Sequence, residues 1–231
     1  MATSTLPAST PAVRSSIGLK LLMAGSGLLF VFYVLAHAYG NLMVLGGPDA
    51  FNNYAHHLRT LGEPMLPYSG FLWVFRLVLI AALALHVYAA LTLWGRANGA
   101  RSTKYAVKKA AASSLASRTM RFGGIALLLF VIFHLLHLTT HTIRPQGEQP
   151  TPYANVVNSF DKWWLVLIYA VAVIALAFHL HHGIWSAAQT LGWTSTTAAR
   201  RNAKFLAHFI GSLVPTAFLI PPLCILFGIV D

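Results

Sequence analysis

Five long apolar runs constrain this chain more than any other feature. They lie at residues 20–45, 68–95, 121–143, 162–191 and 205–230. Each is close to the roughly 20 residues that an α-helix needs to cross the hydrocarbon core of a bilayer. Only 9% of the 231 residues are charged, against about 25% in a typical soluble domain. The sequence therefore predicts an all-α, polytopic membrane protein with five transmembrane helices, formed by residues 17–231 after a mobile tail at residues 1–16.

The distribution of positive charge predicts the orientation of these helices. Twelve of the sixteen Lys and Arg residues lie in the N-terminal segment and in the second and fourth connections, which share one side of the membrane. The connections on the other side contain only Arg59, Arg144 and Lys162. Because positive residues concentrate on the cytoplasmic side, we expect a cytoplasmic N-terminus in the inner membrane of a bacterium. The net charge of +11 then reflects topology and not a nucleic-acid partner.

The single cysteine, Cys224, limits the redox chemistry of the chain. It excludes an internal disulfide, a covalent CxxCH haem attachment and a four-cysteine iron–sulfur cluster. Any iron–sulfur chemistry must therefore belong to a partner.

Most of the eleven histidines fall within the apolar runs. The first four runs contain His37; His86; His134, His137 and His141; and His179, His181 and His182. A single histidine in a membrane helix is adequately explained by a hydrogen bond to a neighbouring helix. Histidines in four successive runs instead favour a shared function, because polar side chains in lipid usually face a bundle interior with a role attached.

The depths of four histidines suggest what that function is. His37 and His134 lie toward the outer side, whereas His86 and His179 lie toward the cytoplasm. The two layers are about ten residues apart, at roughly 1.5 Å per residue. Neutral imidazole can occupy both axial positions of haem iron, which leaves no open position for oxygen. The pattern predicts two b-type haems in a four-helix core, with the fifth helix outside it.

Spacing alone does not decide between neighbouring histidines. His134 and His137 are three residues apart and share a helix face, as do His179 and His182. His137 and His182 therefore stay open as alternative ligands or as residues that contact the ligands. His181 points away from both of its neighbours.

Short motifs surround these histidines. They are Leu35-Ala36-His37 with Asn41, Asp49-Ala50-Phe51-Asn52-Asn53 with Ala55-His56, Gly123-Gly124 before Leu129-Phe130-Val131-Ile132-Phe133-His134, and Phe178-His179-Leu180 before Gly183-Ile184-Trp185-Ser186. Together they resemble the cytochrome b membrane anchor of succinate:quinone oxidoreductases, of the type with one large five-helix anchor and two haems. The resemblance covers roughly residues 17–230.

The resemblance implies an anchor and electron-transfer subunit of a succinate dehydrogenase or fumarate reductase. His37 with His134 would ligate the outer haem, and His86 with His179 the inner one. Partner flavoprotein and iron–sulfur subunits would dock on the cytoplasmic face and carry the dicarboxylate chemistry, and the electron acceptor would be a quinone, menaquinone by analogy. A further small anchor subunit or a higher oligomer stays open. One departure is Ala177, where some members have a proton-carrying glutamate.

Arg76 is the only charge deep inside an apolar run, near the predicted depth of His37. A buried cation needs an anionic partner, and a haem propionate is the candidate. The alternative is an arginine that snorkels to the membrane interface.

Polar residues gather near the outer end of the first three helices. They are Asn41, Tyr54, His56, His57, Arg59, Glu63 and Tyr68, several of them in residues 46–67, where we expect a short amphipathic helix. Their hydrogen-bonding groups and proton sources predict a quinone site beside the outer haem. The alternative is that they cap the bundle and meet water.

Two other functions compete. A dihaem anchor of a hydrogenase or formate dehydrogenase would arrange its haems similarly, but the motifs quoted above argue against that function. A histidine-lined metal or proton transporter usually has carboxylates beside the histidines, and the apolar runs contain none in their central parts.

Overall fold

The computed structural model describes residues 15–99 and 115–231, and in these ranges every regular element is a helix. The elements are α1 (Ser16–Leu42), the 3-10 helix η2 (Met43–Gly46), α2 (Gly47–Thr60), α3 (Gly70–Gly99), α4 (Leu115–Leu138), α5 (Pro152–Phe160), α6 (Trp163–Thr190) and α7 (Thr197–Leu226). Five segments are long and apolar enough to cross a membrane, and they contain α1, α3, α4, α6 and α7. The predicted all-α fold with five transmembrane helices is confirmed. Most of the predicted tail, and Arg101, Lys104, Lys108 and Lys109 of the basic second connection, lie outside the described residues.

Local sequence sets where several helices begin. The hydroxyls of Ser15, Thr151 and Thr196 accept hydrogen bonds from the backbone N–H three residues later, at 3.0, 3.2 and 3.1 Å. Each hydroxyl satisfies one of the backbone donors that a helix start leaves unpaired. Pro152 follows the Thr151 cap, at a position where the missing N–H of proline has no cost.

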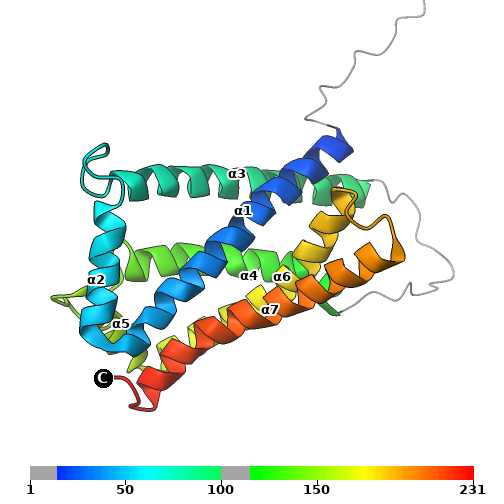
Figure 1. Cartoon of the computed structure of the whole chain (residues 1–231). Helices are drawn as coiled ribbons and strands as arrows, with labels where there is room; N and C mark the ends of the chain where they lie inside the picture. The colour runs from blue at the N-terminus through cyan, green and yellow to red at the C-terminus, as the bar shows by residue number, and fades with distance from the viewer. Residues whose placement is uncertain (1–14, 100–114) are drawn as a thin grey trace, which may run out of the picture.

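Four of the long helices form a four-sided bundle whose fourth side, between α3 and α4, is not closely packed in the described part of the chain. α1 packs beside α3 and α6, and α6 packs beside α4, so α1 and α4 lie on one diagonal and α3 and α6 on the other. α7 lies outside this bundle and packs along α6 and α1 (Figure 1). The prolines of α7, Pro215, Pro221 and Pro222, are buried, so they sit in its packed face while the helix continues to Leu226. The predicted four-helix core with an added fifth helix is thus observed.

Two short helices close one end of the bundle. α2 runs across the long helices, and α5 lies beneath it near the C-terminus (Figure 1). The side chain of Asn52 accepts a hydrogen bond from the backbone N–H of Tyr153 at 3.1 Å, and the Tyr153 hydroxyl donates to the carbonyl of Asp231 at 2.8 Å. We call this end the α2–α5 end, and the opposite end, at residues 191–196, the α6–α7 loop end. α2 is the short helix expected within residues 46–67.

The third apolar run differs from its predicted extent. The run continues to residue 143 in sequence, but α4 ends at Leu138. Beyond it the backbone N–H groups of Thr142 and Ile143 both donate to the carbonyl of Leu136, at 2.9 and 3.1 Å, and His141 adopts a positive φ of 53°. The chain therefore turns back over the helix end, and apolar composition alone does not reveal that turn.

Candidate cofactor site at two pairs of histidines

The first histidine pair joins one diagonal of the bundle. His37 of α1 faces His134 of α4, with ring centroids 5.9 Å apart and ring planes 80° apart. The ring of Tyr33 stacks on His37 at 5.2 Å and 12°, and Phe218 of α7 lies 5.6 Å from it on another side. Apolar and aromatic neighbours thus fix the orientation of His37.

The second pair joins the other diagonal. His86 of α3 faces His179 of α6, with ring centroids 6.2 Å apart and planes 57° apart. Gly27 of α1 lies against His86, where a Cβ would make a van der Waals contact of 3.4 Å with Cε1. Gly124 of α4 stands similarly against His179, where a Cβ would lie 3.8 Å from Cε1.

The spacing of both pairs fits axial ligation of one metal by two imidazoles. With metal–nitrogen bonds of about 2 Å, and about 1 Å from that nitrogen to the ring centre, the two ring centres are about 6 Å apart. Both observed separations agree with this value. Each pair supplies two ligands, so the other ligands of such a metal must come with it, as in a porphyrin.

An unpaired nitrogen supports the same interpretation. Nδ1 of His179 is buried and has no hydrogen-bond partner among the described residues. A buried polar atom left without a partner costs about 1–3 kcal/mol. The cost is explained if this ring turns to a partner that is not a protein atom.

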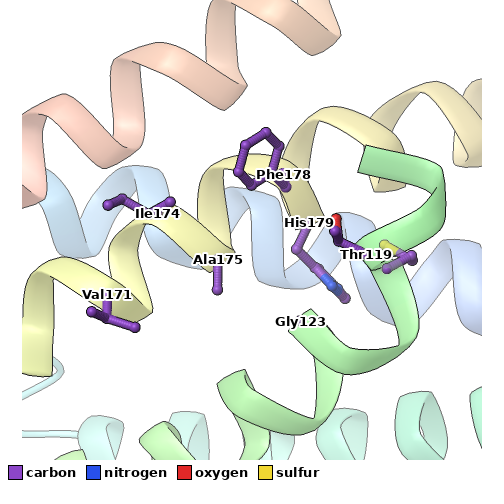
Figure 2. A pocket seen from close by; sticks show the side chains of 8 residues that line it. Thr119, Gly123, Val171, Ile174, Ala175, Phe178 and His179 are labelled. Atoms are coloured by element: carbon purple, nitrogen blue, oxygen red, sulfur yellow. The ribbon is translucent and has the colours of Figure 1, made fainter. Parts of the chain in front are cut away.

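A cavity of about 190 Å³ lies beside His179, between α4 and α6. Figure 2 shows the His179 side chain reaching from α6 toward Gly123 and Thr119 of α4, while Phe178 points away from it. The remaining walls are apolar, from Met120, Val171, Ile174 and Ala175. Space is thus available along one edge of the second pair.

The two pairs lie in separate layers. Ser26 of α1 contacts His86 through an Oγ–Nδ1 distance of 3.1 Å, and Ser26 is eleven residues before His37 on the same helix. Eleven residues are close to three helical turns, so both side chains share a face and are about 16 Å apart along the axis. His37 and His134 form the layer nearer the α2–α5 end.

The neighbouring histidines have different surroundings. His137 is completely buried, and both of its ring nitrogens have protein partners: Nδ1 is 2.9 Å from the Tyr169 hydroxyl, and Nε2 is 3.2 Å from Ser159 Oγ. Both ring nitrogens of His137 are therefore engaged by protein groups, whereas the ring of His134 faces His37. His181 turns to α7, where its ring centroid lies 4.0 Å from that of His208. His182 is half-buried.

Arg76 is half-buried on α3. Its guanidinium carbon lies over the Trp73 ring, 5.0 Å from the centroid, and it is close enough to Tyr33 for an electrostatic interaction. Among the described residues the only ion pair joins Arg144 to Glu148, so no carboxylate there pairs with Arg76. Through Tyr33, Arg76 is placed near the His37–His134 pair.

The predicted quinone residues are brought together only in part. The Asn41 amide donates to the carbonyl of His37 at 2.8 Å. Tyr54 of α2 covers Gly40 of α1, where a Cβ would lie 2.8 Å from the tyrosine hydroxyl. Arg59 donates to the carbonyl of Ala55 at 2.6 Å. The other members of the set, His56, His57, Glu63 and Tyr68, are exposed.

Two residues that contact the histidine pairs were not identified from sequence. Ser26 lies against His86, and Tyr169 of α6 lies 3.2 Å from Nδ1 of His134. Both are polar side chains inside apolar runs, a signal that marks them as unusual but does not separate them from the other hydroxyls in those runs.

The fold and the site define a multi-pass membrane protein whose helical bundle presents paired histidines to its interior. Residues 95–219 match the family described as succinate dehydrogenase/fumarate reductase transmembrane subunit. The chain is also 25% identical over 178 residues to the succinate dehydrogenase cytochrome b558 subunit of Bacillus subtilis (strain 168), covering 77% of this chain and 81% of that protein. The chain belongs to this family and is a membrane anchor subunit of succinate dehydrogenase/fumarate reductase type.

Proposed function

We propose that this subunit binds two b haems, one at each histidine pair, and carries electrons from a partner iron–sulfur subunit to menaquinone. The observation that carries the proposal is the placement of two histidine pairs on the two diagonals of the bundle, in two layers and at the separation of axial ligands. The similarity to a cytochrome b558 subunit supports the cofactor. When bound, the two haems would each carry one electron at a time, so that electron transfer across the membrane is divided into shorter steps.

The protein side chains define what each site can do. His37 with His134, and His86 with His179, would each hold one haem through both imidazoles, which would leave the iron no open position for oxygen. The mostly apolar walls of the cavity beside His179 would limit the access of water to that pair. A single transfer across about 30 Å of hydrocarbon is replaced by steps on the scale of the layer separation, about 16 Å.

The orientation follows from charge. Arg96, Arg200, Arg201 and Lys204 lie at or near the α6–α7 loop end, and positive residues favour the cytoplasmic side. The flavoprotein and iron–sulfur subunits would dock there, nearer the His86–His179 pair. Electrons would then leave through the His37–His134 pair at the α2–α5 end.

The quinone site belongs at the α2–α5 end in this proposal. Tyr54 packs on α1 at Gly40, three residues after His37. The amide of Asn41 donates to the backbone carbonyl of His37 itself. Exposed His56, His57, Glu63 and Tyr68 with Arg59 supply hydrogen bonds and protons. If Tyr54→Phe, His56→Ala, Arg59→Ala and Glu63→Gln all keep normal turnover and quinone affinity with both haems intact, the site lies elsewhere.

A reduced-minus-oxidised absorption spectrum of the purified protein tests the central proposal. The wild type should contain two low-spin b haems per chain. His37→Ala or His134→Ala should remove one haem, and His86→Ala or His179→Ala the other. Retention of both haems in His134→Ala would show that the ligands are misassigned, and a wild-type protein without haem would refute the function.

A further inference from the structure

A buried polar cluster lies at the α2–α5 end, against the His37–His134 pair. It joins α4, α5, α6 and the connection between α4 and α5. Its members are His137, Gln146, Asn155, Ser159 and Tyr169. Ser159 and His137 are fully buried, and Tyr169 and Asn155 are 7% and 8% exposed. So many polar groups in an apolar bundle need a specific arrangement of protons, because any unmatched group is costly there.

The protons can be counted from the α5 side. The Ser159 hydroxyl is 2.6 Å from the carbonyl of Asn155 and must donate to it, since a carbonyl only accepts. Ser159 has one proton, so its oxygen can only accept from Nε2 of His137, 3.2 Å away. The Gln146 amide nitrogen donates to Asn155 Oδ1 at 2.6 Å, which leaves Gln146 Oε1 as a second acceptor 3.3 Å from the same Nε2. Nε2 of His137 therefore carries the proton.

The count continues into α6. No carboxylate is among the partners of His137, and a buried imidazole without an anion stays neutral. Nδ1 of His137 then carries a lone pair, and the Tyr169 hydroxyl donates a hydrogen bond to it at 2.9 Å. Tyr169 has no second proton, so it must accept from Nδ1 of His134, 3.2 Å away. A neutral His134 protonated on Nδ1 presents the lone pair of Nε2.

We propose that Ser159, His137 and Tyr169 form a hydrogen-bonded relay that fixes His134 as the Nδ1–H tautomer and holds its Nε2 ready to bind haem iron. The proposal rests on the proposed function, because it assigns these residues a role toward the haem at the His37–His134 pair. His137 and Tyr169 are positioning residues and not ligands. Hydrogen bonds to the remote nitrogen of a metal-bound histidine set its orientation and raise its basicity.

Ser26 provides an internal comparison at the other pair. Its hydroxyl donates to the carbonyl of Leu22 at 2.8 Å, so its oxygen accepts from Nδ1 of His86 at 3.1 Å. Each pair thus has one histidine whose Nδ1–H is held by a hydroxyl oxygen. Only the relay at His134 reaches through a second histidine into α5.

Redox titration of the purified holoprotein tests the relay. Tyr169→Phe removes the acceptor from His134, which weakens electron donation to iron and favours the reduced state. Both haems should remain, and the midpoint potential of the His37–His134 haem should rise while that of the other haem stays unchanged. Ser26→Ala should shift the His86–His179 haem alone. Unchanged potentials in Tyr169→Phe would overturn the relay and leave the proposed haem function standing.

Two substitutions of His137 separate a relay from mere packing. Glutamine can accept from Tyr169 and donate to Ser159, so His137→Gln should keep the wild-type potential. Leucine cannot accept, so in His137→Leu the Tyr169 hydroxyl loses the acceptor for its own proton and its oxygen becomes a weaker acceptor for the Nδ1–H of His134. The potential of that haem should therefore rise. Equal potentials in the two variants would contradict the proposal. Loss of one haem in both would instead make His137 a ligand.

Discussion

At the scale of single residues, His134 and His137 show how neighbours on one helix face acquire different roles. Both belong to α4 and both contact Tyr169. His137 has protein partners on both nitrogens, whereas the described residues provide a partner for only one nitrogen of His134. The second nitrogen is what a metal requires. The difference arises from α5 and from the connection before it, which enclose His137.

Arg76 provides a prediction at this scale. A cation near the haem proposed at the His37–His134 pair would stabilise the reduced, less positive iron, by an amount on the order of 1–2 kcal/mol at separations of about 10 Å. Arg76→Gln should therefore lower the midpoint potential of that haem, as measured by redox titration. Arg144→Gln, which alters an exposed ion pair, serves as the control. An unchanged potential in Arg76→Gln would place the guanidinium at the membrane interface.

Sequence alone could identify the residues whose type and depth are both unusual, and few others. His37, His86, His134 and His179 could be found because imidazole is rare in lipid and their depths fall into two layers. Tyr169 and Ser26 could not be chosen from the other hydroxyls, because their contacts depend on how α6 and α1 are rotated in the bundle. Gln146 and Ser159 contact His137 only because the chain turns back after Leu138.

At the scale of elements, the contact between α1 and α2 is a point where structure and proposed quinone chemistry meet. Glycine at position 40 lets the Tyr54 ring lie directly on α1. A Cβ there would stand 2.8 Å from the tyrosine hydroxyl and 2.9 Å from Cε1. The clash involves the far end of a side chain, so Tyr54 can move while the helices stay in place.

Gly40→Ala should therefore lower quinone affinity with both haems retained and little loss of stability. Gly25→Ala on the same helix is the matched control, since a Cβ at Gly25 meets nothing within 4 Å. Steady-state quinone reduction measures the effect as a rise in KM. Equal kinetics in the two variants would exclude Tyr54 from the quinone site.

The contact between α6 and α7 supports a stability prediction. A Cβ at Gly211 would lie 3.2 Å from both Cβ and backbone N of His181, and backbone cannot move aside cheaply. Gly211→Ala should destabilise the protein by about 1–2 kcal/mol, because overpacking outweighs the gain in helix propensity. Gly183→Ala, where a Cβ meets nothing within 4 Å, should be neutral or stabilising. Thermal unfolding in detergent compares the two, and a higher melting temperature for Gly211→Ala would contradict the packing argument.

The positions of the helices could be predicted from the sequence wherever an apolar run marks them. The five transmembrane segments and α2 appear where the sequence places them. The end of α4 does not, because residues 139–143 turn back although the segment carries no Lys, Arg, Asp or Glu. No single apolar run predicts that α1 lies opposite α4 and α3 opposite α6, because this arrangement depends on packing between helices.

At the scale of the whole molecule, the proposed orientation can be checked by labelling. In a Cys224→Ser background, Ser195→Cys marks the α6–α7 loop end and Glu148→Cys marks the α2–α5 end; both positions are exposed. A membrane-impermeant maleimide added to intact cells should label residue 148 only, and residue 195 should react after the membrane is opened. The reverse pattern would invert the topology and move the docking face of the partner subunits.

The diagonal arrangement of the histidine pairs also orders the biosynthesis of the protein. His37 and His134 are both present once α4 has been synthesised, whereas His86 has no counterpart until α6 emerges. One pair therefore becomes complete while about two-fifths of the chain is still unmade. Each pair also joins helices that are separated by another transmembrane helix in sequence. A chain that inserted any of the four wrongly would leave a pair open, so with the proposed cofactor its capture would distinguish correctly inserted chains from the others.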